Sequence, residues 1–197
     1  MEDSIHDQYL SLTTYASNWS CLAAADSLRC LHKHINEGGE EFWPGEFRRN
    51  YIYCPERTET GLFQVLRSGA SYFVLGGIAE EVEFTASVDG EMIMIGESLV
   101  VPSGEPVQVS ISFIENTPHD AIELIGNPNG QVQVVAKVRG SDLAHPAGRT
   151  TWMTEVSMVS DPLYLRARGS ACISQPYPVR AWFYTNPLWL IPEGIGM

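Results

Sequence analysis

The sequence EVEFTASV at residues 81–88 alternates polar and apolar residues along its whole length. A second stretch, VQVSISFI at residues 107–114, alternates in the same way until its last position. Successive side chains of a β-strand point to opposite faces of the sheet, so this pattern predicts strands with one buried face and one solvated face. Such strands are typical of antiparallel sheets that pack on a core through one side.

The same period of two recurs at residues 132–138, 152–158 and 163–167, and further apolar runs lie at 71–75, 91–95, 121–125 and 181–190. Gly and Pro punctuate most of the gaps. About eight to ten short strands at this spacing predict a mainly β fold, an antiparallel β-sandwich of the immunoglobulin-like type. The predicted core consists of Val82, Phe84, Val107, Val109, Ile111, Val132, Val134, Leu163 and Leu165.

The N-terminal part has a different pattern. Apolar or small residues recur every three to four positions between residues 17 and 37, which predicts an amphipathic helix, and a shorter helix is expected around residues 7–14. Residues 1–46 are therefore interpreted as a helical segment and loop, residues 47–70 as a strand–helix connector, and residues 71–197 as the sandwich domain. Within the connector, Thr58 is expected to cap a short helix that ends at Gly69.

Composition excludes some partners. The 197 residues include 24 acidic and 12 basic side chains, which gives a formal net charge of −12. Nucleic-acid binding needs clustered Lys and Arg, so neither a nucleic acid nor an anionic membrane surface is expected as a partner. The acidic N-terminus has no signal-peptide pattern, which favours the cytoplasm. The four cysteines allow two disulfides, but free thiols are favoured at this chain length.

An ordered set of segments resembles part of a known family. The segments are FRRNYIY (47–53), GLFQVLRSG (61–69), SYFV (71–74), IGE (95–97), IELI (122–125), YLRAR (164–168) and AWFYTNPLW (181–189). In this order they resemble the β-rich C-terminal region of PHP-type metal-dependent hydrolases (the polymerase and histidinol phosphatase superfamily). The resemblance covers roughly three quarters of the chain.

This resemblance implies a limited role. In such hydrolases an N-terminal domain holds the metals, and residues 1–46 are too short to contain it. The chain is therefore expected to be a non-catalytic accessory or assembly module without a cofactor, and not a complete enzyme. If it is part of one, that enzyme would be a phosphoesterase-like metal-dependent hydrolase. The expected partner is a PHP catalytic domain or a second copy of the chain, through an apolar surface containing Leu22, Leu28, Ile35, Phe42 and Trp43.

Histidines give only weak catalytic or metal-binding candidates. His32 and His34 could share a metal on a strand, but they fall near the end of a predicted helix, where residues two apart do not face each other. A histidine there also suits the negative end of the helix dipole, so a structural role is favoured. His119 and His145 lie in predicted turns and are interpreted as solvated loop residues, with an acid/base pair at His119 and Asp120 as the alternative.

One strand offers a ligand-binding candidate. Tyr164, Arg166 and Arg168 project from the same face of the strand at 163–167, where two guanidinium groups could hold a carboxylate or phosphate. The alternative is an exposed face paired with Glu residues of a neighbouring strand. Trp152, Trp182 and Trp189 could add a stacking platform for a sugar, although aromatic residues of sandwiches are more often in the core. A carbohydrate- or small-ligand-binding module is therefore the second functional hypothesis.

Overall fold

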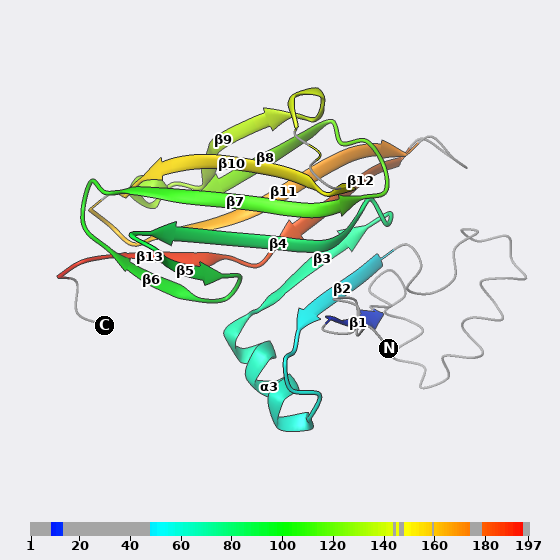
Figure 1. Ribbon diagram of the computed structural model, residues 1–197, viewed down its shortest axis with the longest axis horizontal. Coiled ribbons are helices and arrows are strands. Elements are labelled where there is room, and N and C mark those ends of the chain that lie inside the picture. The colour runs from blue at the N-terminus through cyan, green and yellow to red at the C-terminus, as the bar shows by residue number, and fades with distance from the viewer. Residues whose placement is uncertain are drawn as a thin grey trace, which may run out of the picture.

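The computed structural model describes residues 9–13, 48–143, 145, 148–158, 160–173 and 179–194 (Figure 1). The predicted helix over residues 17–37 lies outside these ranges, as do His32, His34 and the proposed apolar dimer surface. The shorter helix expected around residues 7–14 is wrong. Strand β1 (Tyr9–Thr13) lies there instead and pairs antiparallel with β2 (Arg48–Tyr53), because β2 offers an open edge for backbone hydrogen bonds.

Two sheets make up the described part of the chain, which is mainly β, as predicted. The large sheet has the strand order β1-β2-β3-β12-β11-β13-β6, with β8 also pairing with β11, and β9 with β8. The small sheet has the order β10-β7-β4-β5, and every pairing except β13 with β6 is antiparallel. The strands are β3 (Ser71–Leu75), β4 (Ala79–Val88), β5 (Glu91–Met94), β6 (Ser98–Val101), β7 (Pro106–Glu115), β8 (Ala121–Gly126), β9 (Gln133–Arg139), β10 (Thr150–Ser157), β11 (Leu163–Ile173), β12 (Val179–Thr185) and β13 (Leu188–Pro192).

Inward side chains from both sheets form one hydrophobic core. Phe113 of the small sheet meets Phe183 of the large sheet with 5.2 Å between ring centroids. The alternation on β7, on β11 and on β4 from Val82 onward produces this core, because every second residue there points away from solvent. The predicted core residues that are confirmed as buried are Val82, Phe84, Val107, Val109, Ile111, Leu163 and Leu165.

Two predicted core residues are wrong. Val132 and Val134 are 68% and 45% exposed. Strand β9 lies at the border of the large sheet, where it pairs with β8 alone, and its register shifts between Leu124 and Ile125 of β8. The shift breaks the alternation, so that Val135, Ala136 and Val138 pack against the core in their place.

The helix predicted to begin after Thr58 and to end at Gly69 is confirmed. Helix α3 (Glu59–Ser68) begins after Thr58, whose Oγ1 accepts a hydrogen bond of 3.0 Å from the amide of Gly61. It ends at Gly69, which has φ +80° and donates its amide to Val65 O. Short 3₁₀ turns cover Pro128–Gly130 and Gly140–Asp142. None of the helices in the described part of the chain has the length and apolarity that a membrane crossing requires.

Candidate functional site

The three predicted ligand-binding residues share the outer face of the large sheet. Along β11, Leu163, Leu165 and the residues in step with them are buried, and the residues between them are partly exposed. Tyr164, Arg166 and Arg168 therefore point away from the core, as the alternation predicted.

The neighbouring strand β12 adds aromatic residues to the same face. Tyr184 lies opposite Arg168 in the antiparallel register, and Trp182 lies opposite Ser170. Further along the same side of β11, Trp189 of β13 lies opposite Tyr164, with 5.7 Å between their rings. Trp182 is only partly buried and Trp189 is 42% exposed, so neither belongs to the core.

Guanidinium groups lie over the rings of this face. Arg166 lies over the ring of Tyr184, 5.5 Å from its centroid, and Arg168 lies 5.8 Å from the same ring and 5.7 Å from that of Trp182. Arg180 lies 5.5 Å from the Trp182 ring. These are cation–π distances. We call the alternating set Arg166, Tyr184, Arg168, Trp182 and Arg180 the arginine ladder.

Arg168 is held by an ion pair. Its Nε and Nη2 both donate to Oε2 of Glu123 on β8, and Lys137 Nζ lies 2.9 Å from the other carboxylate oxygen. Burial would raise the pKa of the Glu123 carboxyl, but the bonds and charges of Lys137 and Arg168 outweigh burial and lower that pKa. At Arg168 the structure therefore agrees with the alternative interpretation, in which the exposed face pairs with a Glu residue of a neighbouring strand.

Arg166 is positioned differently. Its Nε donates to the carbonyl of Thr185 at 3.2 Å, which fixes the guanidinium over the Tyr184 ring. Within the described part of the chain its terminal nitrogens donate to no protein acceptor, and Arg180 has no ion pair. Arg166 thus presents a fixed cationic fork with donors that remain for a ligand.

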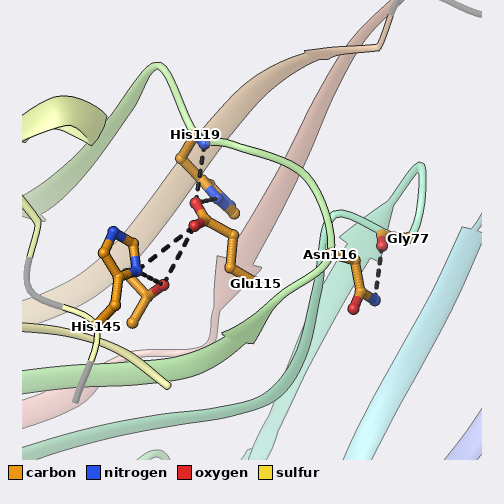
Figure 2. A network of polar contacts seen from close by, with 6 residues as sticks. Gly77, Glu115, Asn116, His119 and His145 are labelled. Atoms are coloured by element: carbon orange, nitrogen blue, oxygen red, sulfur yellow. Dashed lines mark hydrogen bonds and ion pairs between the residues drawn. The ribbon is translucent and has the colours of Figure 1, made fainter. Parts of the chain in front are cut away.

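A second polar cluster lies where β7 ends. Figure 2 shows the Glu115 carboxylate between His119 and His145. One carboxylate oxygen lies 2.9 Å from Nδ1 of His119 and also accepts its backbone amide, at 3.0 Å. The other lies 3.4 Å from the hydroxyl of Thr150 and 3.7 Å from Nδ1 of His145, and that Nδ1 lies 3.0 Å from the Thr150 hydroxyl.

The prediction that His119 is a solvated turn residue is wrong. Only 6% of the residue is exposed, and its ring packs against Phe113 and Phe183 with centroid distances of 4.8 and 5.6 Å. Burial lowers the pKa of the imidazole, although the hydrogen bond to Glu115 opposes this effect. Its Nε2 is enclosed and finds no partner among the described residues, so the ring offers no nitrogen to a substrate. His119 therefore anchors the turn through Glu115.

A cavity of about 280 Å³ lies between strands β3, β4 and β5. Its lining is largely apolar and includes Tyr72, Phe84 and Met94. Ligand sites of this kind normally add a few convergent polar groups. The hydroxyl of Ser112, also on the small sheet, donates to the carboxylate of Glu83 at 3.2 Å. The acidic residue of the lining is therefore already hydrogen-bonded within the protein.

Among the described residues, no group of three or more His, Cys, Asp or Glu side chains is arranged to hold a metal. The weak metal candidates His32 and His34 lie outside the described ranges. Arg180 and Glu123 were not predicted from the sequence as members of the candidate site. For Arg180 a signal was present, because it lies in step with Trp182 and Tyr184 on an alternating strand. For Glu123 there was none, because it is 45 residues from Arg168.

The fold and this face define a mainly β protein of two sheets with an arginine- and aromatic-rich outer surface. No protein-family model matches the chain, and no curated protein matches it either.

Proposed function

We propose that this chain is a non-catalytic β-sandwich module of the immunoglobulin-like type that binds a carbohydrate or small ligand on the outer face of its large sheet. The observation that carries the proposal is the position of Trp182 and Trp189 outside the core, on the face that also holds Arg166. Exposed tryptophan rings offer apolar contact to a sugar, and arginine adds polar contacts that fix orientation.

The test is a binding titration with a panel of neutral and charged oligosaccharides, read by tryptophan fluorescence and calorimetry. Replacing Trp182 by Ala should weaken binding of any hit by about tenfold or more, because the ring adds apolar contact and also holds Arg168 and Arg180 in place. The matched control is Phe63→Ala, which removes an aromatic ring that is 53% exposed on α3. Circular dichroism checks that both variants fold. A panel without a hit, or a hit that Trp182→Ala leaves unchanged, contradicts the proposal.

The second candidate function is an accessory or assembly role beside a PHP-type catalytic domain. It rests on the ordered resemblance, and one observation favours it. The segments FRRNYIY, SYFV, IELI, YLRAR and AWFYTNPLW contribute β2, β3, β8, β11, β12 and β13, all in the large sheet. Five of the seven resembling segments therefore lie in one sheet, as is expected of segments that belong to one structural unit.

Purification of the 21.8 kDa chain tests this role. Metal analysis should find no tightly bound Zn, Mn or Fe in stoichiometric amount, and the chain should have no phosphoesterase activity of its own. Tightly bound metal together with such activity would overturn the non-catalytic assignment. Sedimentation at micromolar concentrations tests the expected homodimer, which a single monomeric species at all concentrations would contradict.

A further inference from the structure

We infer that the arginine ladder selects an anionic, linear oligosaccharide, one that carries carboxylate or sulfate groups, over a neutral one. This inference rests on the proposed binding function and narrows its ligand class. The ladder places three guanidinium groups and two aromatic rings in alternation across β11 and β12, with each ring contacted by two arginines.

The rings are already engaged by cations. Tyr184 is contacted by Arg166 and Arg168, and Trp182 by Arg168 and Arg180, all within 5.8 Å of a ring centroid. A neutral sugar that stacked there would have to displace a guanidinium group and forfeit its cation–π attraction. An anionic sugar can leave the ladder intact and bind at its solvent-facing edge, where the donors are.

The local charge favours an anion, although the whole chain has a net charge of −12. On the outward positions of β8, β11, β12 and β13 the charged residues are three arginines and one glutamate, a local excess of two positive charges. The glutamate, Glu123, is already bound by Arg168 and Lys137. The remaining donors therefore belong to Arg166 and Arg180, and planar guanidinium forks match carboxylate and sulfate oxygens.

The shape of the ladder favours an extended ligand. Outward side chains on a strand recur about every 6.6 Å, so Tyr184, Trp182 and Arg180 follow one another along β12. A linear chain that runs along β12 would meet Arg166 first and Arg180 last, with Arg168, which is bound to Glu123, between them. Several weak charge contacts then add along one ligand, which a single small anion could not exploit.

The experiment uses the full chain and three oligosaccharides of equal length: an oligogalacturonate, a sulfated gluco-oligosaccharide and its neutral parent. Calorimetry at low salt should show binding of at least one charged ligand about tenfold tighter than binding of the neutral one. The Arg166→Gln/Arg180→Gln variant should lose about tenfold or more of that affinity, and added salt should weaken it. Arg67→Gln on α3 removes the same kind of charge from an exposed position outside the sheet and should bind like the unaltered chain.

Each outcome is decisive. A preference for the uronate or for the sulfated ligand supports the inference and identifies the anionic group. Equal binding of the neutral ligand, unaffected by the double variant but lost in Trp182→Ala, overturns the inference and leaves the proposed function standing. Absence of binding to all three overturns the inference, and the wider oligosaccharide panel then decides on the proposed function. An oligothymidylate is titrated as a fourth ligand, and its tighter binding, lost in the double variant, overturns the inference in favour of a nucleic-acid partner.

Discussion

Replacing Gly169 by Ala should destabilise the protein, because an aromatic ring occupies the space of the new methyl group. Gly169 of β11 lies opposite Phe183 of β12. A Cβ at this position would lie 2.1, 2.6 and 2.7 Å from three carbons of the Phe183 ring. Carbon atoms in contact normally stay about 3.5–4 Å apart, so the ring would have to move by more than about 1 Å.

The ring has little room to move. Phe183 is fully buried, and Phe113 and His119 pack against it with centroid distances of 5.2 and 5.6 Å. Overpacking of such a core costs about 1–3 kcal/mol. A chain of about 200 residues loses about 2–4 °C of Tm per kcal/mol, so Tm should fall by about 2–12 °C.

Urea unfolding and a thermal scan measure this loss. Ser170→Ala is the control, because the adjacent side chain points to the outer face and should change stability by less than about 0.5 kcal/mol. Adding Phe183→Leu to Gly169→Ala should cost less than the sum of the two single changes, since the smaller side chain makes room for the methyl group. A loss below about 0.5 kcal/mol for Gly169→Ala, or strict additivity in the double variant, would refute the reasoning.

Three further predictions concern stability. Ile111→Ala should cost about 2–5 kcal/mol in urea unfolding, because the side chain is fully buried between the sheets, and a cost near zero would contradict its central position. Thr58→Ala should cost about 0.5–2 kcal/mol through loss of the α3 cap, whereas Thr58→Ser should retain most of it. Because the pKa of His119 is lowered in the folded protein, the unfolded chain takes up the proton first as the pH falls. The free energy of unfolding should therefore decrease below a pH of about 6.5. This decrease ends once the imidazole of the folded protein is protonated as well. His119→Asn should flatten the unfolding free energy measured from pH 7.5 to 5, and an unchanged slope would assign the effect to other groups.

Much of the fold was predictable from local patterns. The alternation on β4, β7 and β11 gave the buried residues correctly, and Thr58 and Gly69 gave both ends of α3. The prediction failed at Val134 of β9 and at Val132 just before it, which are exposed because the strand borders the sheet and shifts register. It also failed at β1, where pairing with β2 prevails over a weak helical preference.

The candidate site divides in the same way. Its first half, Tyr164, Arg166 and Arg168 on one face, follows from period two along a single strand. The burial of His119 could not be inferred, because a turn sequence describes the backbone conformation and not what packs over the side chain. Glu115, which pairs with the His119 ring, lies only four residues earlier in the sequence. The rings of Phe113 and Phe183, which pack against His119, come from the two different sheets.

The sequence by itself determined which residues of β4, β7 and β11 face solvent, where α3 begins and ends, and that the chain is mainly β. Only the tertiary structure decided that β11 lies between β8 and β12 on this part of the sheet, which brings Arg168 onto Tyr184 and Trp182 and pairs it with Glu123, 45 residues away. The reason is physical: side-chain direction is a property of a few consecutive residues, whereas strand neighbours depend on how all the apolar faces can be buried together.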